Sequence, residues 1–304
     1  MRVGLIGTGL MGVQIANRLL EVGYDLYVHN RTRSKTAEII KNGGKWIDSP
    51  KELGDKCSFA FVCVTDGTAF KQVCLGNDGL IRSVNKELVI GNLSTISPAD
   101  SVECAAALRK NGVQSFQMPV MGGPDIARKG DLVAIISGDK NSIDNNIGVI
   151  ESIARSIFNI GKIDGAANYV KLALNMNIAL IGIALSESIL YIKKAGIDPR
   201  IFIEIFNSTY FKTSLSEKKG PKMINNDFEP RFHLRNMLKD LQLLVASMKP
   251  LNVSLPLSVL AEQMYQAAKN RGYSELDYTA ILAFLQDLNG LRPDRIKHDI
   301  CYKN

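Results

Sequence analysis

Short apolar runs alternate with longer amphipathic segments along the first half of the chain. The runs are rich in Val, Ile and Phe and are bounded by Gly, Pro, Asn or Asp, which is typical of buried strands. Predicted strands cover residues 3–6, 25–29, 59–64, 88–92, 113–117 and 132–137, with weaker candidates at 45–47 and 156–160. Helical segments between successive strands predict a mostly parallel sheet covered on both faces.

Several helix boundaries can be read from single residues. The segment 49–52 (Ser-Pro-Lys-Glu) combines an N-cap serine, a proline at the first helical position and a glutamate at the third, and Ser97 begins a second Ser-Pro start. Gly23, Gly43 and Gly112 stand where preceding helices are expected to end.

The strand pattern stops after about residue 163. No proline interrupts residues 164–195, which predicts one helix of roughly 45 Å at 1.5 Å per residue. Further helices are predicted from Asp198-Pro199 and at about 234–248, 256–271 and 277–289. We therefore expect an α/β domain over residues 1–163, an all-α domain over 164–290 and a charged, exposed tail over 291–304.

Composition and charge exclude several classes of protein. Of the 304 residues, 46% are hydrophobic and 22% are charged, which is ordinary for a globular chain and argues against disorder. The net charge of +7 favours anionic ligands, but the basic residues are scattered, so no nucleic-acid surface is predicted. Five cysteines without a CxxC pair, and histidines without ligand spacing, predict a reducing compartment and no metal.

Neither a signal peptide nor a membrane span is predicted. The first strand begins at Val3 with no basic and apolar leader before it. The most apolar stretch, 172–185, is interrupted by Asn175 and Asn177, so it is interpreted as a buried helix that is too short and too polar to cross a bilayer. A cytoplasmic location is expected.

A glycine-rich turn follows the first predicted strand and opens a helix. In Gly7-Thr8-Gly9-Leu10-Met11-Gly12 the three glycines permit a tight turn, a close approach of backbone to a pyrophosphate, and close helix–strand packing. Unpaired N–H groups at the helix start would bind the anion. The first domain is therefore expected to be a doubly wound, Rossmann-type nucleotide-binding domain.

The end of the second predicted strand decides which dinucleotide is expected. An NAD site would place Asp or Glu here, whereas this chain has Asn30, Arg31 and Thr32. Arginine pairs bidentately with a 2′-phosphate, so the pattern favours NADP (NADPH). Other residues that follow strand ends are expected to line the same pocket: Val64, Thr65, Asp66 and Thr95.

A polar stripe lies on the long helix of the second half. Asn168, Lys171 and Asn175 fall at i, i+3 and i+7, and Gly182 continues the stripe. Their neighbours are apolar, and desolvation disfavours a charged ammonium, so Lys171 could exchange a proton with a substrate oxygen near neutral pH. A lysine that only extends to solvent is the competing interpretation. Because this helix follows the nucleotide domain, Lys171 is expected to border a cleft between the domains.

Five motifs, in order and up to about residue 290, resemble the β-hydroxyacid dehydrogenase family, which includes 3-hydroxyisobutyrate dehydrogenase and glyoxylate/succinic semialdehyde reductase. Residues 7–12 are similar to its Gly-x-Gly-x-Met-Gly fingerprint, and residues 92–98 to the segment whose threonine contacts the cofactor. Residues 119–123 resemble its substrate-binding motif, 165–175 its catalytic-lysine motif and 239–241 its Lys-Asp-Leu motif.

The resemblance implies a role for each matching residue. Lys171 would be the general acid/base and Asn175 would orient the substrate. Gly122 and Gly123 would offer backbone N–H groups to the substrate carboxylate, and Lys239 would lie near cofactor and substrate and help to close the site. The chain would then transfer a hydride between NADP(H) and a small, carboxylate-bearing β-hydroxyacid or its semialdehyde, acting on a CH–OH group.

Met121 departs from the family pattern, which usually has serine at this substrate-binding position. A thioether without a donor replaces a hydroxyl, so a bulkier or less polar substrate is conceivable. One alternative is an imine reductase on the same scaffold, although such relatives usually carry Asp or Tyr in place of the lysine. Another is a non-catalytic NADP-binding module, against which the retained Lys171 speaks.

The long apolar helix predicts self-association. It carries more hydrophobic surface than one small helical domain can cover, so a homodimer or homotetramer is expected to form through the helical domain.

Overall fold

The computed structural model describes residues 1–291, which divide after Lys171 into two compact units. Helix α9 (Ala166–Lys194) contains the boundary between them, so Lys171 belongs to the N-terminal unit and Asn175 to the C-terminal unit. The predicted tail over 291–304 lies, apart from Leu291, outside the described residues.

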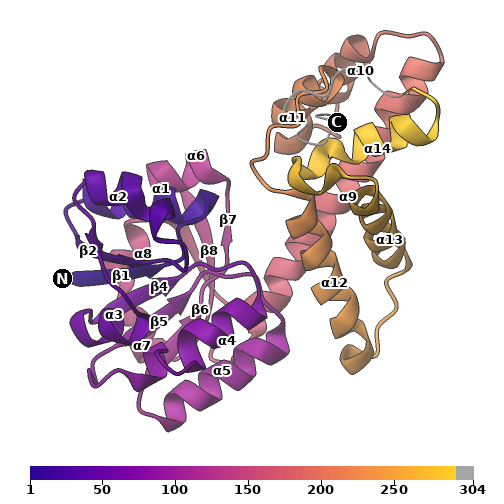
Figure 1. Cartoon of the computed structure of the whole chain (residues 1–304). Helices are drawn as coiled ribbons and strands as arrows, with labels where there is room; N and C mark the ends of the chain where they lie inside the picture. Colours follow the sequence, from indigo (N-terminus) through magenta and orange to yellow (C-terminus); the bar gives the residue numbers. More distant parts are fainter. Residues whose placement is uncertain (292–304) are drawn as a thin grey trace. The chain divides into compact units, whose positions relative to one another are not determined.

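The N-terminal unit contains one mixed sheet, in the order β3-β2-β1-β4-β5-β6-β8-β7 with β9 paired to β8 (Figure 1). The strands from β3 to β6 in this order are parallel, and β8 runs antiparallel to β6 and β7. The predicted strands are confirmed to within two residues at each end: β1 Arg2–Ile6, β2 Asp25–His29, β3 Lys45–Trp46, β4 Phe59–Val62, β5 Val89–Asn92, β6 Gln114–Gln117, β8 Leu132–Gly138 and β9 Ala154–Asn159.

Alternating side chains of the central strands pack on opposite faces of the sheet. On β4, Phe59 and Phe61 join the core on one face, while Ala60 and Val62 join the core on the other. Both faces are therefore buried, which explains why the strands are continuous apolar runs. Eight helices flank the strands in this unit: α1 Leu10–Glu21, α2 Ala37–Lys41, α3 Pro50–Lys56, α4 Gly67–Leu75, α5 Pro98–Lys110, α6 Pro124–Lys129, α7 Lys140–Asp144 and α8 Ile147–Glu151.

The predicted helix boundaries are confirmed by the caps. Ser49 accepts a hydrogen bond from the N–H of Glu52 at 3.2 Å, and Ser97 accepts one from the N–H of Asp100 at 2.9 Å. Gly23, Gly43 and Gly112 follow the ends of α1, α2 and α5 with φ of +89°, +104° and +80°, a conformation in which glycine is favoured.

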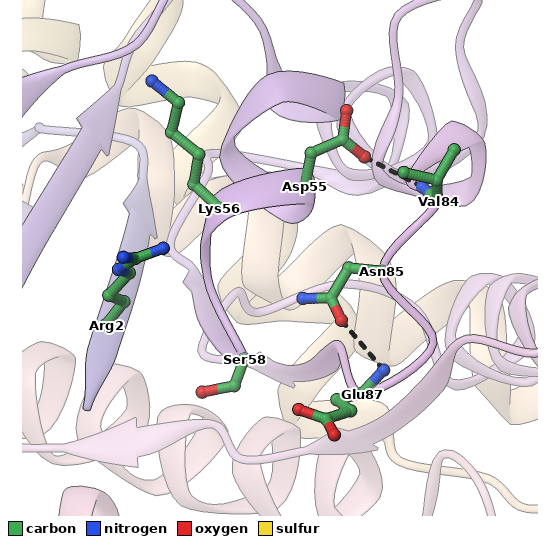
Figure 2. Close-up of a pocket in the computed structure, with 7 residues that line it drawn as sticks. All are labelled: Arg2, Asp55, Lys56, Ser58, Val84, Asn85 and Glu87. Carbon is green, nitrogen blue, oxygen red and sulfur yellow. Dashed lines mark hydrogen bonds between the residues drawn. The ribbon is translucent and has the colours of Figure 1, made fainter.

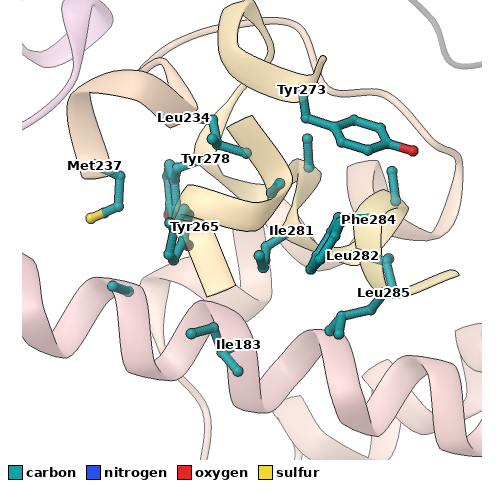
Figure 3. Packing of buried hydrophobic residues seen from close by; sticks show 14 of the residues in the cluster. Ile183, Leu234, Met237, Tyr265, Tyr273, Tyr278, Ile281, Leu282, Phe284 and Leu285 are labelled. Atoms are coloured by element: carbon teal, nitrogen blue, oxygen red, sulfur yellow. The ribbon is translucent and has the colours of Figure 1, made fainter. Parts of the chain in front are cut away.

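The C-terminal unit is helical throughout its described residues. The continuation of α9 packs with α10 Pro199–Asn207, α11 Ser214–Ile224, α12 Leu234–Leu251, α13 Pro256–Asn270 and α14 Ile281–Leu288. Figure 3 shows the centre of this core, in which Ile183 of α9 lies near the rings of Tyr265 and Tyr278. A Cβ on Gly182 would lie 3.6 Å from each of the same two tyrosines. The polar stripe that begins at Asn168 therefore ends in the helical core.

Two elements escaped the sequence prediction. Strand β7 (Val120–Met121) lies between Pro119 and Gly122 and is too short to show a pattern, because only its pairing with β8 makes it a strand. Helix α11 contains Pro221. The sequence signal for the start of this helix was a capping box, in which the side chains of Thr213 and Ser216 each accept a hydrogen bond from the other's backbone N–H. Serine stands here where glutamate is usual, which made the signal hard to recognise.

Helix α9 shows that one argument from the sequence was wrong, namely that this apolar stretch is too short and too polar to cross a membrane. With 29 residues and a mean hydropathy of 1.6 in its best window, it is long and apolar enough to cross a membrane, so length and polarity did not exclude a span. Its contacts identify it as a core helix instead: polar groups of the N-terminal unit hold its first turn, and Ala179, Leu185 and Ile189 are buried among the C-terminal helices.

Candidate active site

The glycine turn between β1 and α1 requires two of its glycines. Gly7 has φ of +98°, and a Cβ there would lie 2.1 Å from the carbonyl oxygen of Cys63. A Cβ on Gly12 would lie 2.0 Å from the carbonyl oxygen of Gly7. Neither atom can be accommodated, so both positions need glycine to bring β1, α1 and the end of β4 together.

The middle of the same turn is open, as a phosphate site requires. A Cβ on Gly9 would meet nothing within 4 Å, and Gly9 stands at the N-cap of α1 without a side-chain cap. The Thr8 hydroxyl is buried and has no hydrogen-bond partner. Leu10 is exposed, whereas Met11 packs on the core. An open helix start beside an unsatisfied buried hydroxyl fits the pyrophosphate of a dinucleotide.

The end of β2 is tied to this turn. The N–H of Thr8 donates to Oδ1 of Asn30 at 3.1 Å, and Nδ2 of Asn30 donates to the carbonyl of Thr32 at 2.8 Å. Asn30 therefore shapes the loop through both ends of its amide. Arg31 and Thr32 are exposed, and the neighbouring Arg33 lies over the ring of Trp46 at 5.2 Å. The loop thus carries two arginines at the carboxyl end of β2.

Residues after β4 and β5 complete the carboxyl edge of the parallel strands. The N–H of Val64 donates to the Ser94 hydroxyl at 2.9 Å, which fixes the two strand ends to each other. Thr65 is exposed and Thr95 half-buried. Asp66 caps α4 by accepting from the N–H of Ala69 at 2.8 Å, so its carboxylate has a structural use that the sequence prediction did not include.

Cys63 directly follows β4 at this edge. Burial raises the pKa of its thiol to about 11, so the thiol stays protonated at neutral pH.

The first turn of α9 is held by buried polar groups of the sheet. The N–H of Gly165 donates to Oε1 of Gln117 at 3.1 Å, and the N–H of Ala167 donates to the Ser137 hydroxyl at 3.0 Å. Asn168 donates to the carbonyl of Ile96 and accepts from the hydroxyl of Ser101. The bonds from Gly165 and Ala167 satisfy helix-start N–H groups that would otherwise be buried without partners. They orient the side chains of the next turn, where Lys171 lies.

Lys171 is turned back onto strand β7. Its Nζ donates to the carbonyl oxygen of Val120 at 2.8 Å and contacts Sδ of Met121 at 3.0 Å. The residue is only 9% exposed, and it is the one lysine or arginine among the buried side chains of residues 1–291. A buried ammonium is costly unless it is hydrogen-bonded, and the Val120 carbonyl supplies such a bond.

A second polar cluster lies within the C-terminal unit. Asp240 is 2% exposed, accepts from Nδ2 of Asn175 at 2.5 Å, and pairs with Nζ of Lys239 at 2.8 Å. Asp240 therefore positions Asn175 and Lys239, two of the predicted site residues. Its place in the Lys-Asp-Leu motif was the available signal.

Gly122 and Gly123 follow Met121 in the turn between β7 and α6. Gly122 has φ of +129°, and both glycines are exposed. They directly follow Met121, which pairs with Val133 of β8 and contacts Lys171.

An open pocket of about 460 Å³ lies at the opposite, amino edge of the sheet (Figure 2). Arg2, Ser58 and Glu87 line it just before or at the starts of β1, β4 and β5. Its polar groups are engaged with the protein: Asp55 accepts from the N–H of Val84, and the N–H of Glu87 donates to Asn85. None of the predicted site residues lines this pocket.

Together, the glycine turn, the edge of the parallel sheet and the buried lysine define an oxidoreductase that uses a nicotinamide dinucleotide. Residues 2–161 match the family described as the NAD binding domain of 6-phosphogluconate dehydrogenase. Residues 165–285 match the NAD-binding domain of NADP-dependent 3-hydroxyisobutyrate dehydrogenase. The chain belongs to the β-hydroxyacid dehydrogenase family and is an oxidoreductase of the kind that acts on CH–OH groups.

Similar proteins cover nearly the whole chain. It is 31% identical to the "Uncharacterized oxidoreductase YfjR" of Bacillus subtilis, over 93% of this chain and 99% of that protein. It is 28% identical to the chloroplastic glyoxylate/succinic semialdehyde reductase 2 of Arabidopsis thaliana, over 93% and 79%. A crystal structure of 3-hydroxyisobutyrate dehydrogenase from Salmonella typhimurium superposes with a TM-score of 0.84 at 25% identity, over 93% and 99%.

Proposed function

We propose that this protein is an NADP(H)-dependent reductase or dehydrogenase of a small β-hydroxyacid or its semialdehyde, with Lys171 as the general acid/base. The observation that carries the proposal is the buried ammonium of Lys171, hydrogen-bonded at 2.8 Å to a carbonyl of the short strand β7. A proton donor held by a backbone carbonyl suits proton transfer to a substrate oxygen.

The chain's own residues supply the proton chemistry. A bound nicotinamide would supply or accept the hydride. In reduction, the ammonium of Lys171 donates a hydrogen bond to the aldehyde oxygen and then gives up that proton as the oxygen becomes a hydroxyl. In oxidation, the neutral amine takes the proton from the hydroxyl. Val120 holds the amine in place in both directions, and Asn175, one turn further along α9, orients the substrate.

NADP as the cofactor rests on the loop after β2. Arg31 is exposed and follows β2. Strand β2 pairs with β1, which leads into the glycine turn, and residues 30–32 include no Asp or Glu. A guanidinium at this edge would pair with a 2′-phosphate, and its exposure leaves its side chain free to reorient toward one.

Replacing Lys171 with methionine tests the catalytic role. Because the general acid is lost and the shape is nearly kept, kcat for aldehyde reduction should fall by about 10²- to 10⁴-fold while the Kd of NADPH changes little. Substrates should include glyoxylate, succinic semialdehyde, methylmalonate semialdehyde and a cyclic imine. Lys194→Met is the matched control, because Lys194 is exposed at the far end of the same helix.

Three outcomes separate the candidate functions. Unchanged turnover in Lys171→Met would contradict the assigned role. Reduction of the imine alone would favour an imine reductase. Binding of NADPH without turnover of any of these compounds would favour a nucleotide-binding module.

We also propose that the C-terminal unit self-associates. Its outer surface carries exposed Tyr191, Ile205, Tyr210 and Phe211, and Phe206 and Phe211 line an apolar hollow of about 290 Å³. Exposed aromatic groups beside an apolar hollow are typical of an interface between copies of a chain. Sedimentation should give a dimer or tetramer at micromolar concentration, and a monomer there would contradict the proposal.

A further inference from the structure

We propose that the outer edge of strand β9 (Ala154–Asn159) pairs with the same edge of a second copy of this chain, antiparallel and about a two-fold axis at Phe158. This surface belongs to the N-terminal unit. It shares no residue with the apolar surface of the C-terminal unit, so it is independent of the self-association proposed for that unit and of the role of Lys171.

Strand β9 lies at an edge of the sheet. Within residues 1–291 it pairs with β8 alone, in the parallel direction. Val133 and Ala134 of β8 pair with β9 and also with β7, so β7 and β9 lie on opposite sides of β8. The outer side of β9 therefore has no neighbouring strand among the described residues, which leaves it open to a strand from another chain.

Two residues of β9 direct their backbone groups outward. The N–H of Ile160, just beyond the strand, donates to the carbonyl oxygen of Ile136 in β8 at 2.7 Å. Because backbone groups alternate in direction along a strand, those of Phe158 also point to β8, whereas those of Ile157 and Asn159 point away from it. Within the described residues, neither Ile157 nor Asn159 has a backbone hydrogen bond outside the ladder with β8.

The outward groups of these two residues complement each other about a two-fold axis. With Phe158 on the axis, Ile157 faces the partner subunit's Asn159, and Asn159 faces the partner subunit's Ile157. Residues that face each other in this way in an antiparallel ladder exchange N–H···O bonds in both directions. The same surface of two copies therefore satisfies all the outward groups of Ile157 and Asn159, as an isologous interface requires.

The side chain on the axis is an exposed aromatic ring. Phe158 is 58% exposed, and Ile160 on the same face of the strand is 41% exposed. Ile157 points to the other face and packs on the core of the unit. At the axis, Phe158 would face the partner subunit's Phe158 in a pair without mutual hydrogen bonds, where side chains come closest. Two rings that are exposed in one chain would bury each other, which favours pairing.

The strand at the other end of the sheet is protected in ways that β9 is not. Strand β3 has only two residues, and its Lys45 forms an ion pair with Asp25 at 2.7 Å. Short length and an edge lysine are common devices that prevent pairing with other chains. Strand β9 has six residues, and positions 156–161 contain no Asp, Glu, Lys, Arg or Pro. No like charges would meet at the centre of the proposed pair, so a second copy fits this edge.

Charge placed on the axis tests the arrangement, because residue 158 would face itself. Phe158→Lys and Phe158→Glu should each weaken the association by about tenfold or more, since like charges replace an aromatic pair. An equimolar mixture of the two variants should restore it. Sedimentation of the full-length protein measures the association. Val84→Lys is the matched control, because Val84 is 73% exposed in the same unit and lies outside β9.

Hydrogen exchange locates the interface separately from any contact of the C-terminal unit. In wild type, the N–H groups of Ile157 and Asn159 should become protected as the protein concentration rises. In each Phe158 variant alone they should exchange about tenfold faster or more, because the pairing is lost. The N–H of Ile160 is the internal reference, because its bond to Ile136 lies within the chain and should protect it at every concentration.

The outcomes separate this interface from the other proposals. Fast exchange of the Ile157 and Asn159 N–H groups at every concentration would overturn it, and would leave the reductase and the association of the C-terminal unit untouched. Unchanged sedimentation of both charged variants, or a mixture that associates no better than either variant alone, would overturn it as well. Two variants of opposite charge keep the test decisive if one of them does not fold.

Discussion

The two edges of the same sheet differ in how their polar groups are used. At the amino edge, a pocket of about 460 Å³ is lined by charged and amide side chains, of which Asp55 and Asn85 are hydrogen-bonded to neighbouring backbone. At the carboxyl edge, the glycine turn leaves an open helix start and a buried threonine hydroxyl without a partner. The carboxyl edge is therefore better suited to an anionic ligand, because a helix start and a hydroxyl are available there.

Asp55 illustrates the structural use of the amino edge. The pKa of its carboxyl is lowered, although burial acts in the opposite direction, because Lys51 and the N–H of Val84 donate to it. A carboxylate satisfied in this way stabilises a loop and has little capacity left for a ligand. Unsatisfied hydrogen-bonding capacity, more than volume, distinguishes the two edges.

Gly7→Ala should have the largest effect at the carboxyl edge. The new Cβ would meet the Cys63 carbonyl at 2.1 Å in a positive-φ conformation, so we expect the free energy of unfolding to fall by about 2–5 kcal/mol and NADPH binding to be lost. Denaturant unfolding and fluorescence titration with NADPH measure the two quantities.

Gly9→Ala is the matched control for this change. Its Cβ would meet nothing within 4 Å, so stability should change by about 1 kcal/mol or less while NADPH binding weakens, because the methyl group occupies the phosphate approach. Equal destabilisation by the two alanines would contradict the view that Gly7 serves the fold and Gly9 the ligand.

Arg31→Ala should have an intermediate effect that is confined to the cofactor. Loss of a charge-assisted hydrogen bond to a 2′-phosphate should weaken NADPH relative to NADH by about 1.5–3 kcal/mol. Because Arg31 is exposed and surface substitutions usually change stability little, the thermal midpoint should stay within about 2 °C of wild type. Equal losses for the two dinucleotides would refute the preference for NADP.

Asn85→Ala supplies the control from the amino edge and the smallest expected change. Its Nδ2 donates to the carbonyls of Gly54 and Cys57, so unfolding should become easier by about 1–2 kcal/mol. NADPH and NADH affinities should both be unaltered. A change in cofactor affinity would mean that the amino edge takes part in binding after all.

The elements with strong local signals were predictable, and those that depend on pairing were not. The alternation of strands and helices, the serine caps before α3 and α5, and the glycine ends of α1, α2 and α5 all act within a few residues. Strand β7 and the antiparallel direction of β8, which was itself predicted as a strand, depend on partners distant in the sequence. Helix α11 contains an internal proline, which usually argues against a helix.

The candidate site divides in the same way. Lys171 and the glycines could be chosen from motif spacing, because each spacing reflects a local geometric need. The hydrogen bond from Lys171 to Val120 and the contact of the buried Asp240 with Asn175 could not be predicted, because each joins residues that are distant in the sequence.

By itself, the amino-acid sequence determined the class of fold and the residue types at the cofactor turn. The spacing of hydrophobic residues and of glycines reflects the local geometry of strands, helices and turns, so it can be recognised without knowing the tertiary structure. Only the tertiary structure decided what surrounds the lysine. Strand β7, formed by pairing with β8, supplies the carbonyl that holds the Lys171 ammonium and the sulfur of Met121 beside it. The chemistry at that nitrogen is set by atoms about fifty residues away in the chain, which no local pattern can specify.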